Sequence, residues 1–168
     1  MNKNKALRLT QAAVTAALYV LLSALSQSVG FCNGIVQCRL SEALTVLPAL
    51  FPATVSGLAI GCLLTNLLTG SAIWDILFGT LATLIGALGT MFIGRLFSKR
   101  KRLLPILAAV PPILANTAVI PPMLVYLCGA EALLPFLFFS IFAGEFISCG
   151  ILGFLLLRIL IRRNDIRS

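Results

Sequence analysis

Long apolar segments alternate with short polar or basic connections along most of the chain. Several apolar runs reach 18 residues or more, and a helix that crosses a bilayer needs about 20. We therefore predict an all-α, polytopic membrane protein with six transmembrane helices, folded as one integral membrane domain over residues 1–168. The expected helices cover about 6–29, 41–50, 53–69, 73–97, 103–128 and 133–163.

Prolines interrupt two of these predicted helices. The short second helix ends in LPALFPA, where Pro48 and Pro52 remove backbone donors. The fifth contains the pairs Pro111–Pro112 and Pro121–Pro122, which we expect to bend or locally unwind it. No convincing internal repeat is present, which disfavours a secondary transporter built from inverted repeats.

The composition restricts the chemistry further. The mean hydropathy is +1.06, and 60% of the residues are hydrophobic. Histidine is absent, which excludes imidazole catalysis and His-ligated metal sites. The five cysteines show no CxxC spacing. The chain also has no nucleophile elbow and no closely spaced pair of catalytic carboxylates, so we predict that it is not an enzyme and uses no metal or cofactor.

The basic residues predict the orientation in the membrane. Six helices place both termini on one side, and twelve of the thirteen Lys and Arg residues then fall on that side. By the positive-inside rule this side is the cytoplasm. We therefore expect a multi-pass protein of the cell membrane with both termini cytoplasmic. The net charge of +8 is explained by this topology, and no nucleic acid partner is expected. Arg39 alone lies on the opposite side.

Two charged residues near the outer end of the second helix are not explained by topology. Arg39 and Glu42 are spaced i, i+3, which places them on one face of a helix. Charges at such a position are usually paired or line a site. Two interpretations stay open: an interfacial ion pair that anchors the helix, or a pair that faces a substrate.

Further polar residues occur at two depths. Asp75 complements the dipole at the start of the fourth helix, and Trp74 suits an interfacial belt. However, Asn66 and Asp75 share the outer side with Arg39 and Glu42, so they could also converge on a ligand pocket around Trp74. Asn116 and Glu145 lie near the middle of the membrane. They either join two helices or form the floor of a site.

The first helix carries two overlapping small-xxx-small pairs, Ala12 with Ala16 and Ala13 with Ala17. Small side chains let another helix approach closely. The partner helix belongs either to this chain or to a separate protein.

Several segments resemble the QueT family, the substrate-binding S-components of energy-coupling factor (ECF) transporters. The most specific is the R-x-S-E-A-L-T-x-L-P block at residues 39–48, and the resemblance includes WDILFGTLATLIGA, PPILANT and AGEFISC. It implies an S-component bundle of six helices without a nucleotide-binding motif. It also implies a transmembrane coupling subunit and two cytoplasmic ATPases as partners. Ala12, Ala13, Ala16 and Ala17 match the alanine pattern that docks on the coupling subunit.

The resemblance also implies a small vitamin-like substrate, a queuosine precursor of the 7-deazaguanine class. One carboxylate can accept both donors of a guanine-like edge, and a cationic aminomethyl group needs a second carboxylate. Glu42, Asp75 and Glu145 are the candidates, followed by Arg39, Asn66 and Asn116, with Trp74 as an aromatic lid. The alternative function is a stand-alone proton-coupled carrier or channel, in which Asp75 and Glu145 relay protons. A purely structural subunit would not explain the buried charges.

Overall fold

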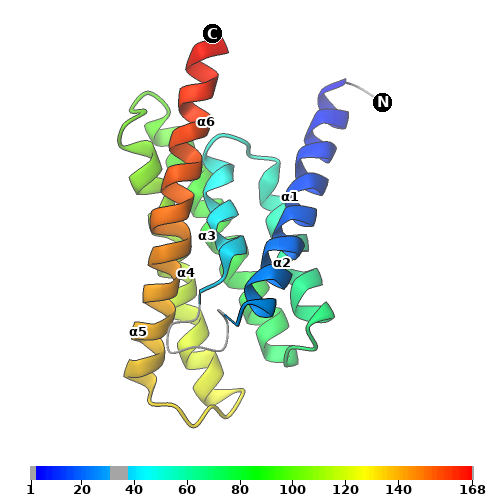
Figure 1. Cartoon of the computed structure of the whole chain (residues 1–168), viewed down its shortest axis with the longest axis vertical. Coiled ribbons are helices and arrows are strands. Elements are labelled where there is room, and N and C mark those ends of the chain that lie inside the picture. The colour runs from blue at the N-terminus through cyan, green and yellow to red at the C-terminus, as the bar shows by residue number, and fades with distance from the viewer. Residues whose placement is uncertain (1–2, 31–37, 168) are drawn as a thin grey trace.

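The computed structural model describes residues 3–30 and 38–167, with the side chains of 164–167 left out, and these residues form a bundle of helices (Figure 1). The all-α prediction is therefore confirmed for the described chain. The elements in order are α1 (Lys3–Ser28), the 3₁₀ helix η1 (Leu40–Ala49), α2 (Thr54–Leu68), α3 (Ile73–Phe97), α4 (Leu104–Tyr126), α5 (Leu134–Glu145), the π-helical segment η2 (Phe146–Gly153) and α6 (Phe154–Arg167).

In the part of the chain that the structure describes, four helical segments are long and apolar enough to cross a membrane. They are Asn4–Ser28, Ile73–Phe97, Leu104–Tyr126 and Leu134–Arg163, the last of which joins α5, η2 and α6. The two shorter apolar helices, η1 and α2, have 10 and 15 residues. At about 2.0 and 1.5 Å per residue they are each shorter than the roughly 30 Å hydrocarbon core. Of the six transmembrane helices that we predicted, four are thus supported by length.

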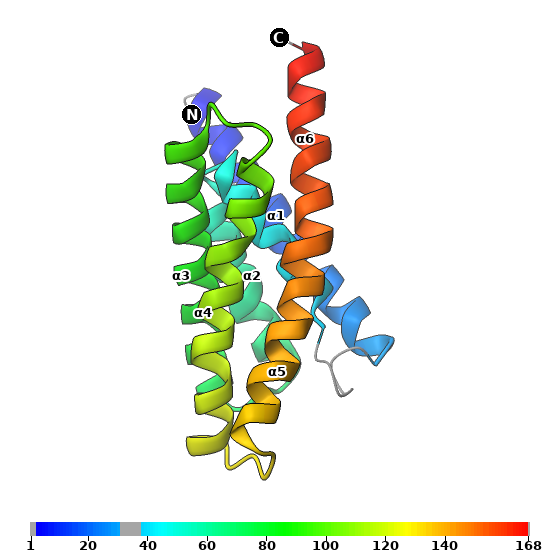
Figure 2. The ribbon, with the colours of Figure 1, turned by 90° about the vertical axis from the view of Figure 1, so that its left-hand side faces the viewer.

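Both ends of the described chain lie at the same end of the bundle (Figures 1 and 2). The connection between α3 and α4, with Lys99, Arg100, Lys101 and Arg102, lies at that end too. The basic clusters that the sequence separates are therefore gathered at one end of the molecule, which we call the basic end.

The 3₁₀ helix η1 occupies the centre of the bundle. Six consecutive residues of η1, 41–46, are buried. Val46 belongs to a core cluster with residues of α4 and α6, and Leu44 belongs to a second cluster with Tyr19 and Leu58. Because η1 is surrounded by other helices, the polar side chains that it carries point into protein and away from lipid.

Close helix packing depends on glycines at the contact points. A Cβ on Gly57 of α2 would clash with the backbone of Ala12, and one on Gly61 would lie 2.8 Å from Cβ of Tyr19. Between α3 and α4, a Cβ on Gly86 would lie 2.7 Å from Cα of Pro112. The absence of side chains at these positions lets the backbones approach, as small residues do in membrane helices generally.

The proline pairs do not unwind α4, which is helical from Leu104 to Tyr126. Of the two expected effects, bending or local unwinding, the structure thus excludes unwinding. Pro112 has no N–H to donate to the carbonyl of Ala108, four residues earlier. The buried hydroxyl of Thr90 on α3 donates to that carbonyl oxygen instead, at 2.9 Å. A neighbouring helix thus satisfies the acceptor that the proline leaves open.

The predicted last helix, 133–163, is continuous but not uniform. It begins as α5, widens into the π-helical segment η2 directly after Glu145, and continues as α6. π-helical turns are uncommon and often accompany functional sites. Here the change of helix type falls beside one of the predicted site residues.

Candidate functional site

The start of η1 is fixed against α1 by two hydrogen bonds that involve serine hydroxyls. The backbone N–H of Leu40 donates to Ser26 Oγ at 2.9 Å, and the hydroxyls of Ser23 and Ser41 are 2.7 Å apart. Arg39 precedes η1 in an extended conformation, with φ −107° and ψ 106°. These contacts set the position from which Arg39 and Glu42 project into the bundle.

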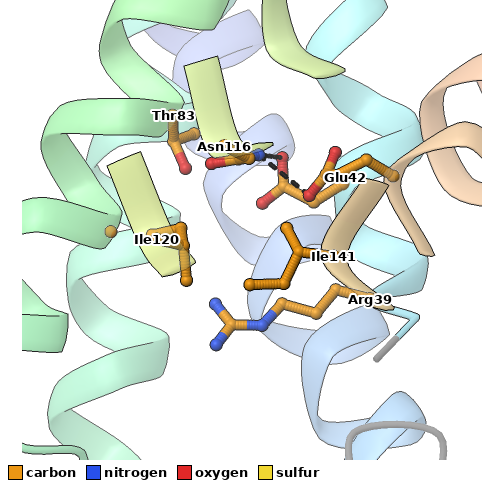
Figure 3. Close-up of a pocket in the computed structure, with 8 residues that line it drawn as sticks. Arg39, Glu42, Thr83, Asn116, Ile120 and Ile141 are labelled. Carbon is orange, nitrogen blue, oxygen red and sulfur yellow. Dashed lines mark hydrogen bonds between the residues drawn. The ribbon is translucent and has the colours of Figure 1, made fainter. Parts of the chain in front are cut away.

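A small polar cavity lies inside the bundle between η1, α3, α4 and α5 (Figure 3). Its volume is about 30 Å³. This is room for a few water molecules, whereas sites for drug-sized ligands hold about 300–1,000 Å³. Its lining residues are Arg39, Glu42, Gly79, Thr83, Asn116, Ile120, Ile141 and Glu145.

Two buried carboxylates meet at one end of this cavity. Glu42 is 2% exposed and Glu145 is 7% exposed. Nδ2 of Asn116 donates to both, at 3.4 Å to Glu42 Oε2 and 2.9 Å to Glu145 Oε1 (Figure 3). The sequence left open whether Asn116 and Glu145 join two helices or form the floor of a site. Their hydrogen bond joins α4 to α5, and both residues also line the cavity.

Each carboxylate has one further donor. The hydroxyl of Tyr19 donates to Glu42 Oε1, and the thiol of Cys149 donates to Glu145 Oε2 at 3.2 Å. Carboxylates removed from water need such partners, because an unpaired buried charge is costly. All the donors are neutral groups, so they stabilise the carboxylates without cancelling their charge.

The guanidinium of Arg39 lies apart from these hydrogen bonds. In Figure 3 it is below Ile120 and Ile141, while Asn116 and Glu42 are above them. Its ion pair is with Asp75, at 3.9 Å between Nη2 and Oδ2, and the two side chains are 35% and 16% exposed. The sequence suggested an ion pair between Arg39 and Glu42, but within the described residues Arg39 pairs with Asp75 instead.

The remaining predicted site residues surround Arg39 or lie outside the cavity. Asn66 is buried, donates to the backbone oxygen of Asp75 at 3.3 Å, and lines a second cavity of about 20 Å³ with Arg39. Trp74 is 41% exposed and packs against Phe78, with ring centroids 6.3 Å apart. It does not line either cavity, which fits the interfacial interpretation of this residue.

Sequence reasoning missed six residues of the site: Tyr19, Gly79, Thr83, Ile120, Ile141 and Cys149. Gly79 and Thr83 follow Asp75 at intervals of four, so the helical period carried a usable signal for both. A Cβ on Gly79 would lie 3.2 Å from Nδ2 of Asn66, so this glycine also keeps space open beside the site.

One group of side chains in the site could hold a metal ion. Ligand atoms of Glu42, Glu145 and Cys149 lie within 4.8 Å of one another, and all three residues are buried. These atoms already receive or make the hydrogen bonds described above. The same group of negative oxygens suits an organic cation, which can donate several hydrogen bonds at once.

The alanines of α1 divide between two faces. Ala12 and Ala16 are partly buried where α1 meets Gly57 and Gly61 of α2, so this pair serves packing within the chain. Ala13 and Ala17 are exposed. The second pair is the more exposed, while Ala12 also lines an open recess with Lys5 and Arg8, so docking by either pair stays a prediction.

Some sequence predictions lie outside the described residues. The question of whether the loop at 30–40 closes over a ligand falls mainly on residues 31–37. Phe31, a further aromatic residue that could cover a ligand, and Cys32, which could form a disulfide with Cys38, lie in the same segment.

Comparisons with known proteins gave one family. A family model described as "QueT transporter" matches residues 9–162, which is most of the chain and includes every residue of the cavity. No curated protein and no solved structure matches the chain.

Proposed function

Because the chain belongs to the QueT transporter family and is therefore a multi-pass membrane transporter, we propose that it is the substrate-capturing S-component of an ECF transporter. In this role it binds a small solute of the 7-deazaguanine class. A transmembrane coupling subunit and two ATPases supply the energy for release.

One observation carries the substrate assignment. Glu42 and Glu145, contributed by two separate elements, converge on a single amide in a buried cavity. A guanine-like edge presents an N–H and an exocyclic amine in the geometry that one carboxylate accepts. An aminomethyl substituent is a cation, and the second carboxylate provides its counter-charge.

The other lining groups suit the rest of such a ligand. The guanidinium of Arg39 is a donor for a carbonyl oxygen of the ring. Ile120 and Ile141 lie between the guanidinium and Glu42 in Figure 3, at the level where a flat heterocycle would be held. We therefore assign apolar contact with the ring faces to this pair instead of Trp74.

The described cavity is too small for a bicyclic ring, so binding requires the lining to separate. Arg39 is the most exposed of the charged lining residues, and its contact with Asp75 is long for an ion pair. We propose that Arg39 and Asp75 part on the outer side when the ligand enters, while the carboxylates on Asn116 stay in place.

Titration of the purified protein with a 7-deazaguanine that carries an aminomethyl group tests this proposal. We expect Glu42→Gln and Glu145→Gln each to weaken binding about ten- to a hundred-fold, because each removes a charged hydrogen bond. Glu131→Gln, which removes a carboxylate from the α4–α5 connection, is the matched control and should bind like the parent. Unchanged affinity in both cavity variants would contradict carboxylate recognition.

Reconstitution distinguishes the S-component from a stand-alone carrier. In liposomes that contain this protein alone, we expect ligand binding but no accumulation. Accumulation should appear when the coupling subunit, both ATPases and ATP are added. Uptake by the isolated protein along a proton gradient would favour the carrier.

A further inference from the structure

A recess at the basic end of the molecule is separate from the substrate cavity. It has an open volume of about 360 Å³ and lies between the α3–α4 connection, the start of α4, and α6. Figures 1 and 2 both place this connection at the end where α6 leaves the bundle. The lining residues are Lys101, Arg102, Pro105, Ile106, Phe154 and Arg158.

Cations from two elements line one side of the recess. Arg102 and Arg158 are both exposed, and Lys101 lines the recess as well. Among the residues that the structure describes, no carboxylate lines the recess. The recess therefore offers several positive donors to an anion, and Arg is the residue best suited to bidentate contact with phosphate.

The guanidinium of Arg158 lies over the aromatic ring of Phe154. Its Cζ lies 5.7 Å from the centroid of Phe154. A cation–π contact at this distance favours this position of the guanidinium and leaves its N–H groups available for hydrogen bonds. This geometry provides a prearranged donor at the mouth of the recess.

The other side of the recess is apolar and continues along the bundle. Ile106 is 55% exposed. Val110 follows it one turn along α4, and the exposed Leu155 in α6 and Ile151 in η2 extend the apolar surface from Arg158. In a membrane protein such a surface faces lipid chains. A ligand with an anionic head and an apolar tail matches both sides of the recess, whereas a free phosphate would use only one.

From this combination we infer that the recess between the α3–α4 connection and α6 binds an anionic glycerophospholipid. Arg102 and Arg158 contact the phosphate, and Ile106 and Phe154 support the first carbons of an acyl chain. Basic pockets between membrane helices at the positively charged side recognise lipid headgroups in this way.

Native mass spectrometry of the full chain in neutral detergent, titrated with phosphatidylglycerol or phosphatidylcholine, tests the inference. The parent should bind phosphatidylglycerol more tightly than phosphatidylcholine. Each arginine near an anionic headgroup contributes about a fivefold effect, so Arg102→Gln/Arg158→Gln should weaken phosphatidylglycerol binding about 30-fold. Binding of phosphatidylcholine should be unchanged.

A matched control removes the same charge from the same end of the molecule. Arg95 and Arg163 are exposed and do not line the recess. Arg95→Gln/Arg163→Gln should change the affinity less than threefold. If the recess double variant does not fold, the single variants Arg102→Gln and Arg158→Gln carry the test, with about fivefold each.

Three results would overturn the inference. One is equal affinity of the parent for the two lipids. Another is an equal loss in the control and recess variants, which would indicate attraction by net charge alone. The third is displacement of phosphatidylglycerol by inorganic phosphate at equal concentration, which would assign the recess to a free anion.

Discussion

At the scale of single residues, the polarity of the cavity depends on one amide. Asn116 donates to Glu42 and Glu145 from the same nitrogen, and no cation lies between the two carboxylates among the residues that the structure describes. Like charges in a buried site repel, and the amide, together with the guanidinium of Arg39 on the same cavity, offsets this only in part. A cationic ligand would complete the charge balance, which links the stability of the site to its occupancy.

Replacing the amide with an apolar side chain of similar size should therefore destabilise the empty protein. We expect Asn116→Leu to lower the free energy of unfolding by about 1–3 kcal/mol, since two buried acceptors lose a donor. Chemical unfolding in detergent measures this. In the Glu145→Gln background the same change should cost about 1 kcal/mol less, because a neutral Gln needs the donor less. Strictly additive losses would contradict the shared amide.

At the scale of helices, a side chain of one helix provides the hydrogen bond that a proline in the next helix cannot donate. The hydroxyl of Thr90 donates to the carbonyl of Ala108, which Pro112 cannot reach with an N–H. Thr90 is completely buried, so no water can take its place. The continuity of α4 thus depends on α3.

Removing this hydroxyl should destabilise the pair of helices. We expect Thr90→Val to lower the free energy of unfolding by about 1–3 kcal/mol through the unsatisfied carbonyl. Thr117→Val is the matched control, because the buried hydroxyl of Thr117 has no hydrogen-bond partner among the residues that the structure describes. Its replacement should be neutral or stabilising. Thermal unfolding of both variants measures the difference. If both variants lose the same stability, the Thr90 hydrogen bond makes no specific contribution.

Substitutions on the two alanine faces of α1 should have different effects, one on folding and one on docking. Ala16 packs where α2 approaches, so Ala16→Leu should reduce folded yield and thermal stability. Ala17 is exposed, so Ala17→Leu should leave both unchanged and weaken capture of the coupling subunit. Size-exclusion chromatography and co-purification with the coupling subunit separate the two effects. Normal capture by the Ala17 variant would exclude this face from docking.

The bounds of most helices could be predicted because their causes are local. The fourth helix was expected at 73–97 and is found at Ile73–Phe97, and the third ends before Gly70, whose φ of +67° favours glycine. The 3₁₀ form of η1, the π-helical segment and the role of Thr90 depend on neighbouring helices, so no pattern along the chain predicts them. They are consequences of packing.

The polar residues of the site could be predicted because polar side chains are costly to place in lipid. Arg39, Glu42, Asn116 and Glu145 were identified for that reason and line one cavity. Ile120 and Ile141 were not, because an isoleucine that faces a cavity looks the same in the sequence as one that faces lipid. Trp74 was expected as a lid because an aromatic residue serves both an interface and a pocket, and here it lies outside the cavity.

At the scale of the whole molecule, the arrangement of charge gives the bundle two unlike ends. The termini and the α3–α4 connection lie together at the basic end (Figure 1). The connections after α2 and α4 lie at the other, where Arg39, Asp75 and Glu131 are the charged residues in the described part. An orientation with the basic end in the cytoplasm opens the Arg39–Asp75 side of the cavity toward the outside.

This orientation can be tested with an impermeant maleimide on intact cells. Cys128 is exposed beyond the end of α4, and Ser98 is exposed beyond the end of α3 at the basic end. In a background without Cys32 and Cys38, we expect Cys128 to be labelled from outside. After Cys128→Ser, a cysteine introduced by Ser98→Cys should be labelled only when the cells are lysed, while the buried Cys62 and Cys149 should stay unreactive in both proteins. Labelling of the Ser98→Cys variant in intact cells would invert the topology, and the cavity would then open toward the cytoplasm and could not capture a solute from outside.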